Sequence, residues 1–418
     1  MNVELVSIGT ELLLGYTVDT NCTFFAREAA AQGIRVVRRA TVGDGPEEIA
    51  EAVRDALERT GAVITSGGLG PTADDLTKPS IAAMFGRGMC LDEGILENLK
   101  ARWKQRGWAG ELPVANRQQA MIPDGCDIII NDHGSAPGIW LEDDRGRWCA
   151  MLPGVPREFR GMAREQLIPR LVGRRGDAPA LVVRSLTLRT TGIAESKLAD
   201  EMDGVDTDLV GTRLAYLPGW EGVDLRLSVW GETDERAAGL LGDAQRAIRA
   251  KVDAWIYGSE EDDLAEVVLT ALRAEGLKIA VAESCTGGML GMRLTAVPGS
   301  SDVVDGGTIA YANAVKVREL GVQEATLLAH GAVSEETARE MASGVRAKFG
   351  VDVGVSITGI AGPGGGTPEK PVGTYCCAVD VRGVVRSFRT TSVGDRHEIR
   401  QRSAQAALNL VRKVLQRV

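Results

Sequence analysis

The sequence is poor in histidine and in aromatic residues. Its 418 residues include three histidines, His133, His330 and His397, and only 4% of the residues are aromatic. The three histidines lie far apart, and no two have the spacing of metal ligands, which argues against a histidine-based zinc site. Hydrolytic chemistry in this chain therefore needs a base other than imidazole.

Signs of disulfides and of membrane spans are also missing. The seven cysteines are an odd number and form no CxxC motif, which favours a reducing compartment over a disulfide framework. No stretch has the ~18 uncharged apolar residues of a membrane-spanning helix. Glu4 and Glu11 stand where an export signal would carry basic and then apolar residues. We therefore expect a cytoplasmic protein that makes no contact with a membrane.

The sequence has fewer basic residues than acidic ones, 48 against 57, which gives a formal net charge of −9. Sequence-independent binding of nucleic acid relies on Lys and Arg side chains that neutralise phosphates, so direct nucleic-acid binding is not expected. At about 150 residues a domain, the length predicts two to three domains.

The N-terminal part alternates strand and helix patterns. Strands are predicted at 3–8, 34–42 and 62–65, and helices at 21–32 and from Pro46 onwards. A further strand at 148–152 and a helix that begins near Pro156 continue the pattern. Such alternation with Gly-rich turns predicts a parallel sheet covered on both faces. We assign this α/β domain to residues 1–170.

The middle part, residues 171–257, is interpreted as a small α+β unit. Strands are predicted at 180–190 and 224–230, and helices at 195–202 and 235–252. The segment GRRGDAP, which begins at Gly173, is interpreted as a linker. Its GRRG letters match the GxxG loop of a KH nucleic-acid module, but that loop joins two helices, whereas this segment precedes a strand.

The third part, residues 258–418, again has an α/β pattern. It begins with a helix at 262–275 and a strand at 278–282, and it ends with a helix at 397–415. With about 160 residues it is long enough for a core of its own.

A glycine-rich motif, SGGLGPTADDLT at 66–77, follows the buried strand at 62–65. Gly68 and Gly70 allow main-chain amides to approach a phosphate, and Thr72 can add a hydroxyl. Asp74 and Asp75 offer carboxylates that suit a hard divalent cation. The alternative is a Gly-Pro turn followed by an Asp that caps a helix. The motif is not a P-loop, because GxxxxGK[ST] is absent.

Other polar residues follow neighbouring strands of the predicted sheet. Glu11 and Asp44 come after the first and second strands, and Glu158 follows the strand at 148–152. Each one alone is typical of a turn or a helix cap. The carboxyl ends of parallel strands meet at one edge, so together they predict a phosphate and metal site there.

A second motif, AESCTGG at 282–288, follows the strand at 278–282. Ser284 is predicted to open a helix, where free main-chain amides can stabilise an oxyanion; the alternative is a helix N-cap. Cys285 is the rival nucleophile. A cysteine nucleophile normally needs a nearby imidazole or another cation, and no histidine is close to it in the sequence.

A base for Ser284 is found in YANAVK, residues 311–316. A lysine such as Lys316 can take a serine proton when burial lowers its pKa, and Tyr311 can relay or orient that proton. The alternative is that Lys316 is a solvated helix residue beside Arg318.

The motif SITGIAGPGGG at 356–366 also stands at a predicted strand end. Its main-chain N–H groups can hold a nucleotide phosphate, although such a segment can equally be a surface loop. Arg396, just before the last helix, suits a phosphate.

Taken in order, these motifs resemble the CinA family of competence/damage-inducible proteins. SGGLGPTADDLT and PGVPREF resemble its N-terminal, molybdopterin-binding-like domain. AESCTGG, YANAVK, HGAVS, SITGIAGPGGG and KPVGT resemble its C-terminal domain. The resemblance implies a small KH-type domain between the two.

For the C-terminal domain the resemblance implies deamidation of nicotinamide mononucleotide (NMN) to nicotinic acid mononucleotide and ammonia, without a cofactor. Ser284 would be the nucleophile, Lys316 its general base and Tyr311 the helper in proton transfer. The nucleotide site would be lined by Thr286, Gly287, Thr358, Gly359, Ala361, Gly362 and Arg396.

For the N-terminal domain the resemblance implies a metal-dependent pyrophosphatase that cleaves ADP-ribose to AMP and ribose 5-phosphate. Gly68, Gly70 and Thr72 would face the pyrophosphate. The ligands of the divalent cation, Mg²⁺, Mn²⁺ or Co²⁺, would be Asp74, Asp75 and Glu158. The family also implies a homodimer.

Two alternatives stay open. One is a protein that binds or adenylylates molybdopterin through its first domain, because fold alone does not decide function. The other is a non-enzymatic interaction protein in competence or DNA uptake; the net charge of −9 leaves protein partners open.

Overall fold

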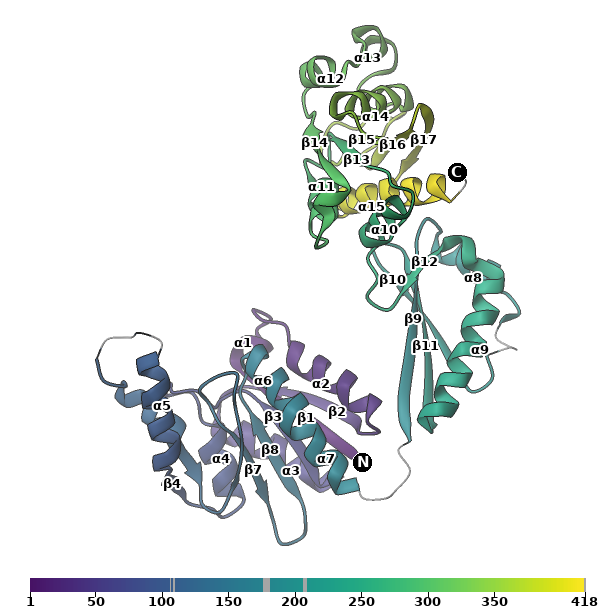
Figure 1. The fold of residues 1–418 in the computed structure, drawn as a ribbon. Coiled ribbons are helices and arrows are strands. Elements are labelled where there is room, and N and C mark those ends of the chain that lie inside the picture. The colour runs from purple at the N-terminus through teal and green to yellow at the C-terminus, as the bar shows by residue number, and fades with distance from the viewer. Residues whose placement is uncertain (106, 108–109, 176–180, 206–208, 417–418) are drawn as a thin grey trace. The chain divides into compact units, whose positions relative to one another are not determined.

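The computed structural model describes residues 1–105, 107, 110–175, 181–205 and 209–416. The chain divides into two compact units. The first comprises Met1–Arg184 with Val229–Ala238, and the second comprises Ser185–Ser228 with Gly239–Val418. Figure 1 labels the helices and strands of both units.

The first unit contains a six-stranded sheet. Its strands, in spatial order, are β2 (Arg35–Val42), β1 (Asn2–Ile8), β3 (Ala62–Ser66), β8 (Trp148–Leu152), β7 (Gly138–Glu142) and β6 (Asp127–Ile129). Strands β2, β1, β3 and β8 are parallel, as predicted. Strands β7 and β6 run antiparallel, so the prediction of a parallel sheet is wrong at this edge.

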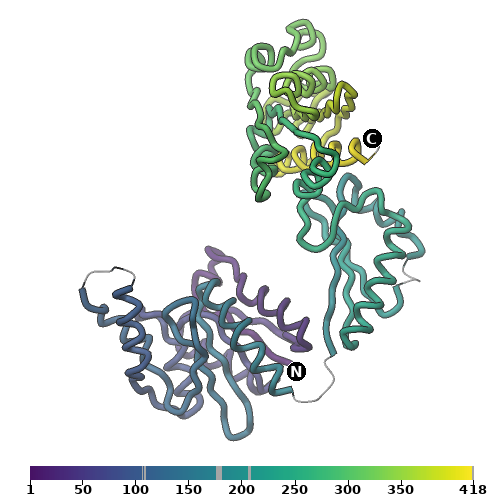
Figure 2. The backbone as a smooth tube through the Cα atoms, viewed as in Figure 1, coloured from purple at the N-terminus to yellow at the C-terminus, as the bar shows by residue number. Residues whose placement is uncertain are grey.

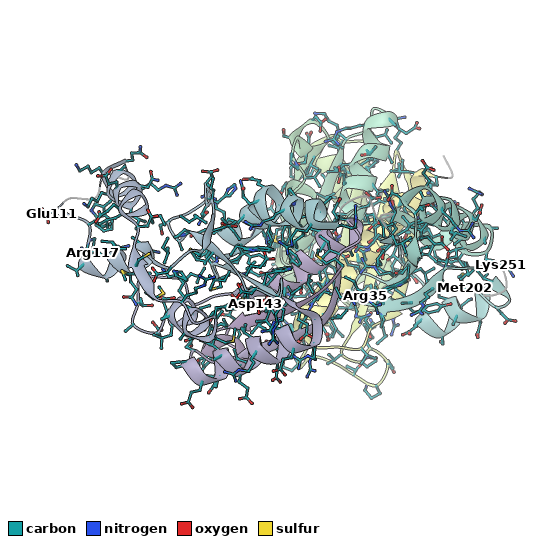
Figure 3. All side chains as sticks on the ribbon, turned by 90° about the horizontal axis from the view of Figure 1, so that it is seen from below. Arg35, Glu111, Arg117, Asp143, Met202 and Lys251 are labelled. Carbon is teal, nitrogen blue, oxygen red and sulfur yellow. The ribbon has the colours of Figure 1, made fainter. Side chains whose placement is uncertain are left out.

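A short hairpin causes the reversal. Strands β7 and β8 are joined by a turn in which the main-chain N–H groups of Arg145 and Arg147 donate to the carboxylate of Asp143 at 3.0 Å. Asp143 is labelled in Figure 3. A turn this short can only connect antiparallel neighbours, because a parallel pair needs a long crossover.

Helices cover both faces of this sheet (Figure 1). They are α1 (Thr10–Leu13), α2 (Thr20–Ala31), α3 (Pro46–Thr60), α4 (Thr77–Met84), α5 (Glu93–Gln105), α6 (Pro156–Met162) and α7 (Ile168–Arg175); a small ribbon is formed by β4 (Met89–Leu91) and β5 (Met121–Pro123). Because side chains alternate along β1, Leu5 packs with Phe25 of α2 on one face, and Val6 packs with Val53 of α3 on the other. The predicted coverage is confirmed.

Helices α6 and α7 are joined by a π-helical turn, η2 (Ala163–Leu167), into one long helix. This helix passes residue 170, the domain boundary expected from the sequence. Arg174 lies in its last turn and pairs with Glu142 of β7 at 2.7 Å. The linker interpretation of GRRGDAP is therefore wrong for residues 173–175, which are helical because Leu171 and its neighbours have a buried face. Residues 176–179 lie outside the described residues.

The middle domain is an α+β unit, as predicted. It contains β9 (Val182–Thr190), α8 (Glu195–Glu201), β10 (Arg213–Pro218), β11 (Val223–Glu232), α9 (Asp234–Val252) and β12 (Ile256–Ser259). The sheet order is β10-β11-β9-β12, and both helices lie on one side of it (Figure 1). Lys251 of α9 and Met202 after α8 lie near each other (Figure 3), and Lys251 Nζ donates to the carbonyl of Asp203 at 3.2 Å.

The C-terminal domain has a five-stranded sheet in the order β14-β13-β15-β16-β17. Its strands are β13 (Ile279–Glu283), β14 (Val304–Ile309), β15 (Val353–Gly359), β16 (Thr374–Val381) and β17 (Val384–Thr391). Its helices are α10 (Leu264–Ala274), α11 (Met289–Thr295), α12 (Asn313–Leu320), α13 (Glu324–His330), α14 (Glu335–Phe349) and α15 (Arg396–Leu415). Strands β14, β13 and β15 are parallel, and β16 and β17 are antiparallel.

The core of this domain lies on both sides of its sheet. Helices α10, α11 and α15 pack on one face, and α12 and α14 on the other. The first and last helices of the domain, α10 and α15, are far apart in the sequence but lie side by side (Figure 2). Leu264 of α10 and Val411 of α15 belong to the same buried cluster. Across the described ranges, no helix combines the length and apolarity needed to cross a membrane.

Two helical glycines give a matched stability test. A Cβ on Gly344 of α14 would lie 1.9 Å from the carbonyl oxygen of Leu320, whereas a Cβ on Gly239 of α9 would meet nothing within 4 Å. We expect Gly344→Ala to lower the free energy of unfolding by about 1–3 kcal/mol through overpacking. Gly239→Ala should raise it by up to ~1 kcal/mol through helix propensity. Thermal unfolding of the two variants checks this, and shifts in the same direction would contradict the described packing.

Candidate active sites

The first candidate site lies in the C-terminal domain, where Lys316 meets Ser284. Ser284 directly follows β13, and Lys316 lies in α12, which follows the adjacent strand β14. The Lys316 Nζ and Ser284 Oγ atoms are 3.1 Å apart. The side chain of Lys316 is buried, with 1% exposure, so the solvated-lysine alternative is wrong.

Two main-chain carbonyls complete the surroundings of this amine. Lys316 Nζ donates to the carbonyl of Ala310 at 2.8 Å and to that of Tyr311 at 3.1 Å. Among the residues described, no carboxylate pairs with it, and burial lowers its pKa. A neutral amine has two N–H groups and one lone pair. If the amine is neutral and its two N–H groups donate to these carbonyls, its lone pair is left for the hydroxyl of Ser284, 3.1 Å away.

Cys285, the alternative nucleophile, directly follows Ser284 in the chain, and its protonation state argues against this role. Burial raises the pKa of its thiol to about 11, so the thiol is protonated near neutral pH. Its sulfur lies close to Gly359, where an added Cβ would come within 3.0 Å of it. The position of Cys285 thus fits a packing role.

The helix after Ser284 begins later than predicted. Helix α11 starts at Met289, and Gly288, not Ser284, occupies its N-cap position. The carboxylate of Glu283 accepts from the amides of Gly288, Leu290 and Gly291 at 2.8–3.0 Å. The expectation that Ser284 opens this helix and uses its free amides is therefore wrong, because Glu283 already takes them.

Donors for an oxyanion remain in the loop itself. The amide of Ser284 donates to the carbonyl of Ile357 at 2.9 Å, and that of Gly287 to Ser284 at 3.1 Å. In contrast, the amides of Cys285 and Thr286 donate to no other described residue. The buried hydroxyl of Thr286 also has no partner within the described ranges. These groups directly follow Ser284 in the chain and are available to a ligand oxygen.

Tyr311 is placed differently from its predicted role. Its carbonyl holds Lys316, but its phenol is 61% exposed, and Arg396 Nη2 donates to its hydroxyl at 3.3 Å. Arg396 Nη1 also donates to the carbonyl of Gly362 at 2.6 Å. The phenol thus contacts an arginine of the expected nucleotide site and, in the described structure, donates to neither Ser284 nor Lys316.

The predicted nucleotide-site residues gather at the end of β15, beside Ser284. The hydroxyl of Thr358 donates to the carbonyl of Ala332 at 2.7 Å, and Ala361 is buried. Gly359 packs closely on Tyr375, and Gly362 has a positive φ of 81°.

Arg400 also lies at this site and was not predicted from the sequence. Its Nη2 donates to the carbonyl of Thr286 at 2.6 Å, beside Gly287, and its buried Nε has no partner among the described residues. Arg400 stands four residues after Arg396 on the same helix, so both side chains lie on one face. The spacing could have revealed it.

The second candidate site is a cleft of about 490 Å³ in the N-terminal domain. It lies at the carboxyl ends of β1, β3 and β8, as predicted. Asn21 of α2, which the sequence analysis missed, joins two of these ends: its Nδ2 donates to Ser66 Oγ at 2.9 Å and to the carbonyl of Gly154 at 2.8 Å. No local sequence pattern reveals this contact.

The charge of this cleft is one-sided. The acidic residues that line it are Glu11, Asp19, Asp44, Asp74, Asp75 and Glu158. Within the described chain, no Lys or Arg belongs to its lining. These carboxylates repel an anionic ligand unless a cation offsets their charge.

Asp75 has a structural task in the glycine-rich loop. Its carboxylate accepts from the amide of Gly70 at 2.7 Å, from the amide of Thr72 at 2.8 Å and from the Thr72 hydroxyl at 2.5 Å. A Cβ on Gly68 would lie 2.0 Å from Thr77 Oγ1, so this glycine permits close packing of the loop. The predicted metal ligand Asp75 and the predicted phosphate ligand Thr72 thus bind each other.

The other two predicted metal ligands are held separately. Asp74 is exposed at the mouth of the cleft, and Glu158 accepts from Asn131 Nδ2 at 2.5 Å. In the described ranges, no three His, Cys, Asp or Glu residues form a metal-binding cluster.

Family models match three successive parts of the chain. Residues 4–172 match "Probable molybdopterin binding domain", residues 185–258 match "Damage-inducible protein CinA KH domain", and residues 261–415 match "CinA C-terminal domain".

Relatives match along almost the whole length. A CinA-like protein of Gemmatimonas aurantiaca is 59% identical over 418 residues, which cover 100% of this chain and 97% of the relative. A CinA-like protein of Chloroherpeton thalassium is 41% identical, with 99% of each chain covered. A crystal structure of a competence/damage-inducible protein from Agrobacterium tumefaciens is 41% identical over 37% of this chain and 93% of its own, with a TM-score of 0.36. The chain therefore belongs to the CinA family.

Proposed function

We propose that this protein is a bifunctional hydrolase of pyridine-nucleotide recycling, which deamidates NMN in its C-terminal domain and cleaves ADP-ribose in its N-terminal domain. One observation carries the first activity: a buried lysine amine lies 3.1 Å from a serine hydroxyl, with two carbonyls on its N–H groups. This arrangement suits a serine nucleophile with a lysine base, and no metal is required for it.

The deamidation follows from this geometry. Ser284 Oγ attacks the carboxamide carbon of NMN while the neutral Lys316 amine accepts the hydroxyl proton. The amides of Cys285 and Thr286 stabilise the oxyanion. When the intermediate collapses, Lys316 returns the proton to the leaving nitrogen, and ammonia departs. Water then hydrolyses the acyl-enzyme with Lys316 again as base, which releases nicotinic acid mononucleotide and restores Ser284.

The nucleotide part of NMN has suitable partners beside this pair. Arg396 and Arg400 lie on one face of α15 near the catalytic loop, and their guanidinium groups suit a phosphate. The glycine-rich segment after β15 allows close approach of the main chain to the sugar and phosphate.

Three variants test the serine–lysine pair. We expect Lys316→Met to reduce ammonia release from NMN by about 10²–10⁴-fold, because the general base is lost. Ser284→Ala should reduce it at least as far. Cys285→Ala, the matched control, should keep activity within a few-fold of wild type, because its thiol is protonated. Wild-type rates in Ser284→Ala, or inactivity of Cys285→Ala alone, would contradict the assignment.

The second proposed activity is supported by the acidic cleft of the N-terminal domain. The diphosphate of ADP-ribose carries negative charge, and this lining offers carboxylates but no basic side chain. A divalent cation held by Asp74 and its neighbours would neutralise the phosphates and position a water. The glycine-rich loop, fixed by Asp75, presents its main chain to the ligand.

A second candidate function is favoured by the family model of residues 4–172, whose description names molybdopterin binding. Molybdopterin also carries a phosphate, so the same cleft can serve it. Purified protein supplied with ADP-ribose and Mg²⁺, Mn²⁺ or Co²⁺ separates the two candidates. Release of AMP supports the pyrophosphatase, and no AMP with any of the three cations favours molybdopterin.

Two neighbouring aspartates should respond differently. We expect Asp74→Asn to lower ADP-ribose cleavage by about 10–100-fold at limiting cation, with an unchanged melting temperature. Asp75→Ala removes the acceptor of three loop hydrogen bonds and should lower the free energy of unfolding by about 1–3 kcal/mol. Both variants should keep NMN deamidation, which serves as the control. Wild-type cleavage by Asp74→Asn across all cation concentrations would contradict the role of Asp74.

Partners other than nucleotides remain predictions. The homodimer that the family resemblance implies is tested by the mass of the particle in solution. The expected lack of direct nucleic-acid binding is tested by titration with DNA and RNA at low salt, where electrostatic binding is strongest.

A further inference from the structure

A second large cleft, of about 650 Å³, lies within the second unit. The turn after β9 and the β10–β11 loop form one wall, and strands β16 and β17 with helix α15 form the other. Neither Ser284 nor Lys316 belongs to its lining, so the cleft is separate from the serine–lysine pair. Nothing in the two proposed activities uses it.

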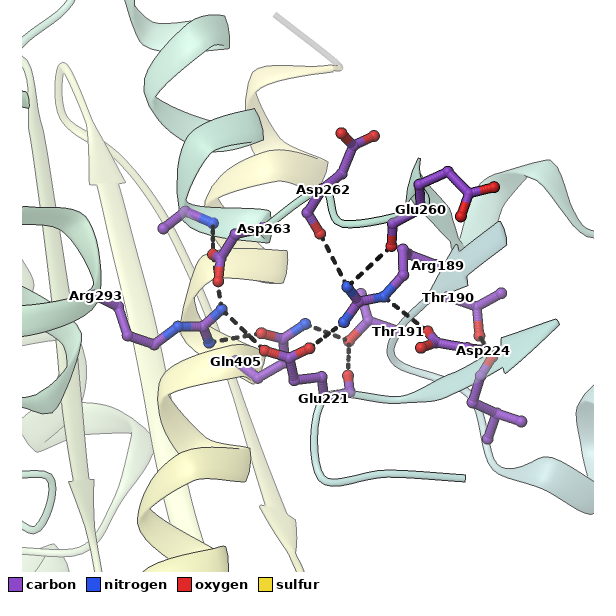
Figure 4. Close-up of polar contacts among 12 residues, drawn as sticks. Arg189, Thr190, Thr191, Glu221, Asp224, Glu260, Asp262, Asp263, Arg293 and Gln405 are labelled. Atoms are coloured by element: carbon purple, nitrogen blue, oxygen red, sulfur yellow. Dashed lines mark hydrogen bonds and ion pairs between the residues drawn. The ribbon is translucent and has the colours of Figure 1, made fainter. Parts of the chain in front are cut away.

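Basic residues gather in this cleft. Its cationic lining residues are Arg389, Arg402 and Lys413, and its one acidic lining residue in the described chain is Glu221. Glu221 is already neutralised, because its carboxylate pairs with Arg189 and lies 3.6 Å from Arg293 (Figure 4). Among the described lining residues, basic side chains thus outnumber acidic ones, in a chain whose net charge is −9.

Arg402 lacks a partner of its own. Its Nε is buried without a hydrogen bond, and no carboxylate of the described residues pairs with its guanidinium. Arg402 is partly buried, and its guanidinium presents N–H donors in a planar fork that fits a phosphate. On the same helix, Lys413 Nζ lies near the turn at Gly192, 3.8 Å from where a Cβ on that glycine would stand.

Aromatic rings line the cleft beside these cations. Tyr375 and Phe388 form an edge-to-face pair with ring centroids 6.4 Å apart. Trp220 comes from the opposite wall, and its ring lies against Arg293, 5.6 Å from ring centroid to guanidinium carbon. Aromatic surfaces on both walls suit a flat ring, because stacking on them is favourable.

We propose that this cleft binds a nucleoside monophosphate. Arg402 and Lys413 take the phosphate, and the base lies between the aromatic side chains of the two walls. The volume of the cleft falls within the range of about 300–1,000 Å³ that small-molecule sites occupy. The polar network of Figure 4, in which Gln405 of α15 contacts Thr191 and Arg293, holds the two walls together.

Trp220 supplies a local reporter, since none of the described residues that line the acidic N-terminal cleft is a tryptophan. AMP is titrated into the full-length protein, and tryptophan fluorescence is followed. We expect saturable quenching that is lost in Trp220→Phe. In Arg402→Met the apparent Kd should rise at least about 10-fold, and Lys413→Met should weaken binding in the same direction. Arg386→Met is the matched control, because Arg386 is an exposed arginine of β17 outside the lining.

Two further ligands test separately how much the nucleoside and the phosphate contribute to binding. Adenosine and inorganic phosphate should each bind at least about 10-fold more weakly than AMP. If Arg402→Met and Lys413→Met, both with wild-type melting temperatures, bound AMP like the wild type, the proposal would be overturned. Phosphate that bound as tightly as AMP would overturn the role of the aromatic rings. Arg402→Lys keeps the charge and should bind AMP with intermediate affinity.

Discussion

The contact between a buried amine and a serine hydroxyl is the interaction on which the proposed chemistry of the C-terminal domain depends. It exists because β13 and β14 are parallel neighbours, so that Ser284 and the carbonyls of Ala310 and Tyr311 leave the sheet at the same edge. Helix α12 then returns Lys316 to that edge. Burial of a lysine is unfavourable for its charged form, and the two carbonyls give the neutral form a full set of hydrogen bonds. In the proposed mechanism, this buried lysine takes the part that a histidine plays in many serine hydrolases.

The two proposed phosphate sites differ in their charge. Among the described residues, the lining of the N-terminal cleft has carboxylates and no basic side chain, so the proposed ligand there would bind together with a cation. The lining of the cleft beside α15 has two arginines and a lysine, and its one acidic residue, Glu221, pairs with Arg189 and lies close to Arg293. Both proposals are compatible with an acidic chain, because local charge governs binding at a site, whereas net charge governs long-range attraction.

The sequence predicted those features that follow from strand order and local periodicity. The loop at 66–77 and Glu158 were expected together because parallel strands end at one edge, and Ser284 was paired with Lys316 because the serine needs a base. Features that depend on the path of a loop were not predictable. Glu283 accepts hydrogen bonds from helix amides that were expected to be free near Ser284. Asp75 likewise accepts a hydrogen bond from an amide of its own loop. In both cases the loop folds back on a neighbouring carboxylate. The antiparallel strand β7 was not predicted, because a hydrophobic run indicates a strand but not whether it runs parallel or antiparallel to its neighbours.

The protonation state of Lys316 tests the central claim most directly. The full-length protein, labelled with ¹³C at lysine Cε, can be titrated by NMR, with Lys316→Arg to assign the resonance. Burial disfavours the ammonium, so the pKa must move down from about 10.4 and the neutral fraction at any given pH must rise. A titration midpoint clearly below 10.4, with deamidation falling as the pH drops through it, is the predicted result. A midpoint at or above 10.4 would show that Lys316 remains charged and cannot accept the proton of Ser284.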